Sequence, residues 1–281
     1  MQQFRPTVWA ITMVGVALAG TLHVAASSAQ INDQGGDAAV KEIEKYRQAL
    51  GDGNPAELWE ARGEAMWKQK RGPNNASFEQ CDIGLGPGKV KGAYTVLPKY
   101  FRDTDKVEDL ESRLVTCMVM LQGYKYADAT KIPFGSPEQK SDIEALVAYV
   151  TTESRGLKMN VSASHPKEKR AYDIGKTMFF YRGGPHDFGC VTCHGADKQR
   201  IRLQDLPNLT SKQQVQRAYT SWPAYRVSQG ELRSFQWRLF DCFRQQRFPE
   251  LEFISQGSIA LTMYLAKNAN GGVLSAPSIK R

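Results

Sequence analysis

The sequence predicts a mostly α-helical protein made of two tandem, related halves. At 281 residues the chain is long enough for two domains of ordinary size, each with its own core. Apolar residues recur at helical spacing, for example at Ala171, Ile174 and Met178. The third observation is an internal match: when the sequence is slid against itself by 112 residues, glycines, large apolar residues and a cysteine coincide.

The internal match keeps its order along the chain. The offset of 112 pairs Gly63 with Gly175, Met66 with Met178, Trp67 with Phe179, Gly72-Pro73 with Gly184-Pro185, and Cys81 with Cys193. Farther on, the pattern R-L-x-x-C occurs at 113–117 and again at 238–242, and A-L-x-x-Y occurs at 145–149 and at 260–264. We therefore expect one domain at 30–157 and a second at 158–281, with the polar stretch 154–167 at the boundary.

A haem attachment motif lies in the second half. The run Cys190-Val191-Thr192-Cys193-His194 has the C-x-x-C-H spacing of c-type cytochromes. Two thiols three residues apart lie on one side of a helical turn, where both can bond to one porphyrin, and His194 then faces the iron. A thioredoxin-like pair lacks the surrounding βαβ pattern, and a zinc site lacks a second C-x-x-C. The second half is thus predicted to be a class I cytochrome c domain with one covalently bound haem c.

The first half has lost this motif. At the offset of 112, Phe78 stands in place of Cys190 and Asp82 in place of His194. The first half is therefore predicted to be a cytochrome c-like domain without haem. Cys81 and Cys117 occupy equivalent places in it and, in an oxidising compartment, can form a disulfide. The alternative is a pair of buried free thiols.

Cys242 is the fifth cysteine outside the N-terminal segment, and it follows the haem motif at about the distance of the second axial ligand in class I cytochromes. The only methionine after the motif is Met263, in the closing helix, and the histidines His165 and His186 lie upstream of it. Cys242 is therefore the best candidate for the axial iron ligand opposite His194. It would also place a sulfur nucleophile at the iron.

Arginines gather around Cys242. Arg238 lies one helical turn before it, and Arg233, Arg244 and Arg247 add positive charge nearby. Guanidinium groups favour the thiolate form of a cysteine and can hold a dianionic oxyanion by paired hydrogen bonds. A catalytic role for Arg238 competes with a scaffold role, because Arg113 precedes Cys117 in the same way in the half without haem.

The N-terminus has the features of a Sec-type export signal. Arg5 precedes an apolar stretch, and small residues then gather before a cleavage site expected after Ala29, which makes 1–29 the signal peptide. The alternative is an uncleaved membrane anchor, because residues 7–26 carry no charge. After cleavage we expect no membrane span and a periplasmic location. The net charge of +8 favours anionic partners, but no basic run interleaved with aromatic residues supports nucleic-acid binding.

Beyond the signal, nearly all of the chain resembles the SoxA family, the cytochrome subunits of the bacterial SoxAX sulfur-oxidation enzyme. The matching runs are R-G-P-N-N-A-S at 71–77, L-P-K-Y-F at 97–101, D-L-E-S-R-L at 109–114, F-G-C-V-T-C-H-G at 188–195, and 238–249 around Cys242. Some family members carry haem in both domains, whereas Phe78 and Asp82 place this chain with the mono-haem type.

The resemblance implies an L-cysteine S-thiosulfotransferase that joins thiosulfate oxidatively to a cysteine of a SoxYZ-like carrier. It implies a SoxX-like small cytochrome c as the heterodimer partner that accepts electrons. It also implies that Cys242 is the axial ligand and sulfur-transfer residue and that Arg238 is an active-site arginine. Two other classes stay open: an electron-transfer cytochrome whose Cys242 only tunes the haem, and a haem sensor in which Cys242 yields to a gas ligand.

Overall fold

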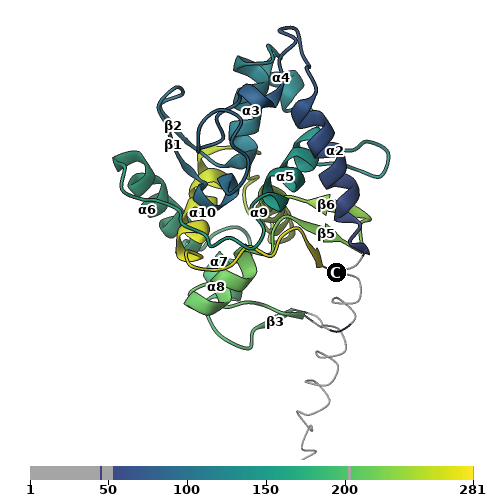
Figure 1. The fold of residues 1–281 in the computed structure, drawn as a ribbon. Helices are drawn as coiled ribbons and strands as arrows, with labels where there is room; N and C mark the ends of the chain where they lie inside the picture. The colour runs from purple at the N-terminus through teal and green to yellow at the C-terminus, as the bar shows by residue number, and fades with distance from the viewer. Residues whose placement is uncertain (1–44, 46–52, 202–203, 281) are drawn as a thin grey trace, which may run out of the picture. The chain divides into compact units, whose positions relative to one another are not determined.

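Two pairs of helices frame the protein, one pair in each half of the chain (Figure 1). The computed structural model describes Lys45 and residues 53–201 and 204–280. In the first half α2 (Ala56–Lys68) packs against α5 (Asp142–Thr152), and in the second half α6 (Pro166–Phe180) packs against α10 (Gln256–Asn268). Helices dominate the described residues, so the predicted mostly helical fold is confirmed.

The remaining elements connect the members of each pair. The first half contains η2 (Phe78–Gln80), η3 (Ala93–Val96), β1 (Lys99–Phe101), β2 (Lys106–Glu108), α3 (Leu110–Met120) and α4 (Tyr126–Ala129). The second contains α7 (Cys190–His194), β3 (Arg200–Ile201), β4 (Gln204–Asp205), α8 (Lys212–Tyr219), β5 (Ala224–Arg226), β6 (Glu231–Arg233) and α9 (Phe235–Gln245), and β7 (Ser278–Lys280) follows α10.

A glycine stands at each helix crossing because the two backbones approach too closely for a side chain. A Cβ atom added to Gly63 would lie 2.0 Å from the carbonyl oxygen of Ala145. A Cβ added to Gly175 would lie 1.9 Å from the carbonyl oxygen of Ala260. Real Cβ atoms do not approach an oxygen this closely, so only glycine allows either crossing. The glycines paired by the sequence match therefore do the same work in their two helix pairs.

An aromatic pair packs beside each crossing. The ring centroids of Trp67 and Tyr149 are 6.0 Å apart in the first half, and those of Phe179 and Tyr264 are 5.3 Å apart in the second. Trp67 and Phe179 are both buried. Tilted rings at these distances contribute apolar burial as well as favourable edge-to-face contact.

The hairpins repeat with the same register at an offset of 125 residues. In the first half Lys99 pairs with Glu108 and Phe101 with Lys106. In the second half the corresponding pairs are Ala224 with Arg233 and Arg226 with Glu231. The helices that follow, α3 and α9, also begin and end at this offset. β7 adds a third strand, parallel to β5, to the second hairpin alone.

The two halves share one continuous core of buried apolar side chains. Equivalent residues meet between them: the rings of Tyr94 and Tyr219 stack with centroids 6.5 Å apart, and the backbone N–H of Gln236 donates to the carboxylate of Glu111 at 3.4 Å. Burial, together with the nearby carboxylate of Asp109, raises the pKa of Glu111 to about 8. The contact between the halves is therefore both apolar and polar.

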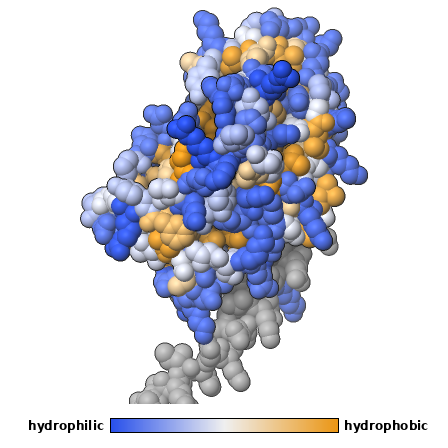
Figure 2. Space-filling view, turned by 90° about the vertical axis from the view of Figure 1, so that its left-hand side faces the viewer, coloured by the Kyte–Doolittle hydropathy of each residue, from blue (hydrophilic) through white to orange (hydrophobic). Residues whose placement is uncertain are grey.

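The surface on the α6 side is hydrophilic over much of its area, with hydrophobic residues in separate patches (Figure 2). Ile174, Phe180 and Tyr181, on and just after α6, are among the exposed apolar side chains. Within the described ranges no helix combines the length and the apolar character needed to cross a bilayer. The expected signal peptide at 1–29 lies outside the described residues.

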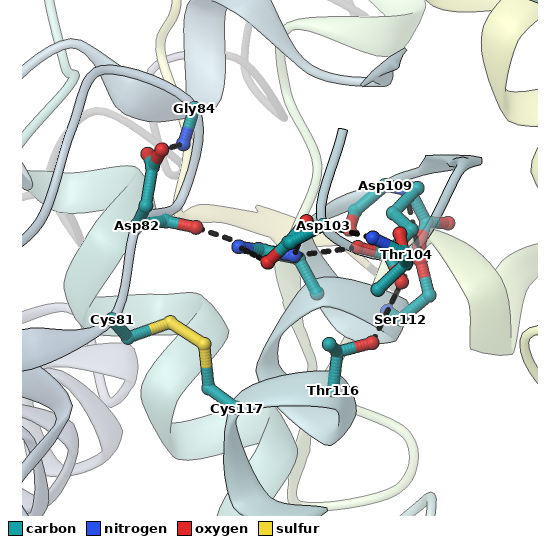
Figure 3. Close-up of polar contacts among 11 residues, drawn as sticks. Cys81, Asp82, Gly84, Asp103, Thr104, Asp109, Ser112, Thr116 and Cys117 are labelled. Atoms are coloured by element: carbon teal, nitrogen blue, oxygen red, sulfur yellow. Dashed lines mark hydrogen bonds and ion pairs between the residues drawn. A yellow bond between two sulfur atoms is a disulfide. The ribbon is translucent and has the colours of Figure 1, made fainter. Parts of the chain in front are cut away.

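A disulfide joins Cys81 and Cys117 in the first half (Figure 3). The two residues are 36 positions apart and both are buried. The bond ties the segment after η2 to α3, so it holds together two elements that lie at opposite ends of a long loop. Closing a loop of this length stabilises a fold chiefly by restricting the unfolded chain.

Replacing Gly175 by alanine is expected to destabilise the protein by about 1–3 kcal/mol, because the new methyl group forces α6 and α10 apart. Gly63→Ala should have an effect of similar size. Gly53→Ala is the matched control, since a Cβ there meets nothing within 4 Å. Chemical denaturation measures the difference, and equal stability of the Gly175 and Gly53 variants would contradict the packing account.

The double substitution Cys81→Ala/Cys117→Ala is expected to lower the free energy of unfolding by roughly 4 kcal/mol in the chain-entropy model. Thermal unfolding with and without reductant measures it. Reductant should lower the midpoint of the parent and leave that of the double variant unchanged. If reductant leaves the unfolding midpoint of the parent protein unchanged, the disulfide does not contribute this stability.

Candidate functional site

The short helix α7 presents the two cysteines of the C-x-x-C-H motif. Two glycines flank it because backbone groups pass close by: a Cβ on Gly189 would lie 2.5 Å from the Tyr181 carbonyl oxygen, and one on Gly195 would lie 2.5 Å from that of Val191. The hydroxyl of Thr192 accepts a hydrogen bond from the backbone N–H of Gly189 at 3.0 Å, which caps the first turn. Cys190 and Cys193 are free thiols, half-buried, on consecutive turns.

His194 is held in one orientation by its Nδ1 atom. Nδ1–H donates to the carbonyl oxygen of Pro207 at 2.8 Å, while the N–H of Leu209 donates to the His194 carbonyl at 2.8 Å. This fixes the tautomer in which Nε2 carries the lone pair, the form needed for metal ligation. Burial lowers the pKa of His194, and the charge of Arg238 lowers it further. Both effects favour the neutral form of the imidazole.

Helix α9 presents Cys242 one turn after Arg238. The helix begins at a serine cap, where the Ser234 hydroxyl accepts from the N–H of Trp237 at 3.2 Å. Burial raises the pKa of Cys242, while Arg238 and then Arg226 act to lower it. The expected preference for a thiolate is therefore weaker than the number of arginines suggested, because desolvation outweighs them.

The three free cysteines share one electrostatic environment. Burial raises the pKa of Cys190 to about 12, and Cys242 is the next contributor to that rise. Cys193 in turn contributes to the raised pKa of Cys242. Cys242 of α9 therefore lies within electrostatic range of the cysteines of α7. Two free thiols on adjacent turns, a histidine with a free Nε2 and a third sulfur nearby form a donor set that fits a covalently attached haem c.

The other candidate ligands have separate places. The Nδ1 atom of His165 accepts from the Lys167 N–H at the start of α6, and its ring stacks on Tyr100 with centroids 3.7 Å apart. His186 is exposed and lies against Phe188. Met263 is fully buried in α10.

The arginines expected near Cys242 differ in their contacts. Arg244 is exposed and pairs with Asp241 at 2.8 Å. Arg233 is buried, donates to the Gly135 carbonyl at 2.7 Å and lies over the Trp237 ring. Arg247 is exposed at the end of α9. The sequence analysis missed Arg226 of β5, whose charge acts on both Cys242 and Arg238. Its hairpin matches β1–β2 in backbone register and not in side chains, so no local sequence motif marks it.

The corresponding places in the first half carry different chemistry. The Asp82 carboxylate, at the position of His194, accepts from the N–H of Gly84 at 2.7 Å (Figure 3). It also accepts from the N–H of Gly86 at 2.8 Å. Phe78, at the position of Cys190, is fully buried and stacks on Trp67 with centroids 5.5 Å apart. Both residues are part of the local packing of the first half.

Comparisons with known proteins agree with this geometry. Residues 62–159 match the family model described as "SoxA/TsdA, cytochrome c domain". The L-cysteine S-thiosulfotransferase subunit SoxA of Hydrogenophilus thermoluteolus is 51% identical over 277 residues, which cover 99% of this chain and 100% of the relative. A subunit of the same name from Hydrogenobacter thermophilus is 32% identical over 228 residues, covering 81% of this chain and 82% of the relative.

A solved structure has the same fold. The crystal structure of SoxXA from P. pantotrophus matches with a TM-score of 0.69 and 23% identity, covering 84% of this chain and 84% of that chain. The half-buried cysteine motif, the oriented histidine and the near full-length relatives lead to one conclusion. The chain belongs to the SoxA family of L-cysteine S-thiosulfotransferase subunits.

Proposed function

We propose that the chain is the catalytic subunit of a haem-dependent L-cysteine S-thiosulfotransferase, which conjugates thiosulfate oxidatively to the carrier cysteine of a SoxYZ-like protein. The observation that carries the proposal is the α7 motif, in which two cysteines outside any disulfide precede a histidine held by its Nδ1 atom, with Cys242 and Arg238 of α9 as electrostatic neighbours. It supports a sulfur nucleophile and a cation beside the predicted haem. The relatives named L-cysteine S-thiosulfotransferase subunit SoxA support the reaction class.

In this reaction the sulfane sulfur of thiosulfate becomes bonded to the carrier's cysteine sulfur. The carrier S–H bond breaks, one S–S bond forms, and one proton and two electrons leave the substrates. A haem c held by Cys190, Cys193 and His194, with Cys242 as the second axial ligand, would supply an acceptor for single electrons. Cys242 would form an S–S bond to the sulfane sulfur as the two electrons are lost. The carrier thiol would then displace the Cys242 thiol from that sulfur and release its own proton, while Arg238 offsets negative charge beside Cys242.

We infer a single haem, in the second of two cytochrome c-like domains at 30–157 and 158–281. The repeated glycine crossing and hairpin register support common ancestry of the halves. In the first half, Cys81 is committed to a disulfide, and Phe78 and Asp82 stand at the positions of the attachment cysteine and the ligand. The family model for a cytochrome c domain, which covers 62–159, supports the cytochrome-like origin of this half.

Two protein partners follow from the same proposal. A SoxX-like small cytochrome c would form the heterodimer and receive electrons, which the likeness to the SoxXA crystal structure supports. A SoxYZ-like carrier would bind transiently. We propose a periplasmic location after removal of residues 1–29, where the Cys81–Cys117 disulfide would persist.

Replacing Cys242 by methionine tests the proposal. Methionine can still ligate iron but cannot exchange sulfur, so conjugation of thiosulfate to the carrier is expected to fall to background. The product is measured by mass spectrometry of the carrier protein, whose mass increases when thiosulfate is attached. The internal control is the variant itself, which should still carry covalent haem and still become reduced by dithionite. A Cys242→Met protein that conjugates thiosulfate at the parent rate would favour the electron-transfer cytochrome instead.

A further inference from the structure

Arg226 is a partly buried arginine without a carboxylate partner among the described residues. It extends from the last position of β5, and its Nε atom is buried with no hydrogen-bond acceptor. Its guanidinium lies over the Trp237 ring, 5.9 Å from the centroid. Burial and the charge of Arg238 both lower its pKa, which marks a site with surplus positive charge. A buried donor without an acceptor in the protein is a place where a ligand or a water molecule supplies one.

In the first half, the arginine at the equivalent position is neutralised by neighbouring side chains. Arg113, the counterpart of Arg238, is buried and donates to Asp103 at 2.7 and 3.0 Å and to Glu108 at 3.1 Å. It also donates to the Asp82 carbonyl and stacks over the Phe101 ring, 4.0 Å from its centroid. Asp103, Thr116 and the neighbouring acidic residues of this network are drawn in Figure 3. Arg113 is thus fully partnered and has a structural role.

The second half has exchanged the three side chains that surround Arg113. At the offset of 125 residues, Phe101 becomes Arg226, Asp103 becomes Ser228 and Glu108 becomes Arg233. The hairpin register is unchanged, so these residues occupy equivalent positions around the second arginine. Positions that carry two carboxylates and a phenyl ring in the first half therefore carry two guanidiniums and a hydroxyl in the second.

The remaining carboxylate does not balance the charge. Asp241 is engaged by Arg244 at 2.8 Å and by the amide of Gln245 at 2.6 Å, and it reaches Arg238 only at 3.4 Å. Arg233 has its own acceptors: its Nε donates to Gln229 at 2.7 Å, and Glu144 of α5 lies 3.6 Å from its guanidinium. Arg226 and Arg238 are left as the under-compensated pair, and both act on Cys242.

We propose that Arg226 and Arg238 together form an oxyanion site beside Cys242, which holds the sulfonate group of thiosulfate. Arg226 is then a substrate-binding residue. Two guanidinium groups match the charge and the tetrahedral oxygens of a sulfonate. With the sulfonate held there, the sulfane sulfur is directed to Cys242. This inference rests on the proposed function for the identity of the substrate, but the oxyanion site itself does not depend on catalysis.

Arg226→Gln, in the full chain with its haem and cytochrome partner, tests the site. The expected result is a rise of about 10- to 100-fold in the KM for thiosulfate with a much smaller change in kcat, because one charged hydrogen-bonding partner is lost. Arg226→Lys keeps the positive charge but loses the paired N–H donors of the guanidinium. Its KM for thiosulfate should fall between those of the parent and of Arg226→Gln. The control is Arg170→Gln, which removes the same charge from the exposed face of α6.

Direct binding gives a second readout that does not need turnover. Sulfate is an unreactive tetrahedral dianion, and calorimetry at constant ionic strength should show it binding the parent and the Arg170 variant equally. Arg226→Gln should weaken that binding by the same factor as it raises KM. The two proposals can fail separately. If the parent protein does not conjugate thiosulfate but binds sulfate in an Arg226-dependent way, the proposed function is refuted and the oxyanion site is supported.

An opposite pattern would overturn the inference. If Arg226→Gln leaves the KM for thiosulfate and the Kd for sulfate within about twofold of the parent, Arg226 does not bind substrate. A shift of the haem reduction potential in that same variant would then identify the acceptor of Arg226 as a haem carboxylate.

Discussion

At the crossing of α6 and α10 the helices pack backbone to backbone, because a Cβ atom added to Gly175 would lie 1.9 Å from the carbonyl oxygen of Ala260. This contact fixes the direction in which α6 ends, and the loop after α6 must then turn back through Gly189 against the Tyr181 carbonyl. That turn sets the position of α7, and the bond from His194 to Pro207 sets the orientation of the imidazole. The site is thus positioned by backbone contacts that begin at a single glycine.

The same frame carries two different chemistries. In the first half, the crossing at Gly63 supports a disulfide, a buried arginine with two carboxylates and a phenylalanine at the position of the attachment cysteine. In the second half, the equivalent positions carry three free cysteines and a surplus of arginine. Burying an arginine without a carboxylate is costly, so a protein retains such an arrangement where a ligand supplies the missing charge. The comparison of the halves therefore shows which positions keep the same backbone contact and which carry different side chains.

Much of this could be predicted from the sequence because the strongest signals are local. The C-x-x-C-H motif, the R-L-x-x-C pair and the matched glycines identify the helix pairs, α7 and Cys242 without any knowledge of distant contacts. Arg226 could not be found in this way. Between β1–β2 and β5–β6 the side chains have diverged so far that Tyr100 and Tyr225 are the only identical pair, although the backbone pairing is the same. Counting the arginines in the sequence also could not predict the direction in which the pKa of Cys242 shifts. Burial raises this pKa and opposes the effect of Arg238.

Peptide mass spectrometry of the mature protein tests the central claim most directly, namely that haem chemistry belongs to the second half and structural sulfur chemistry to the first. The account predicts one haem, on the peptide that contains Cys190 and Cys193, and a disulfide between Cys81 and Cys117. It predicts that Cys242 is found outside any disulfide with those residues, as a thiol or carrying added sulfur. A second haem on the first half, or Cys242 bonded to Cys190 or Cys193, would contradict it.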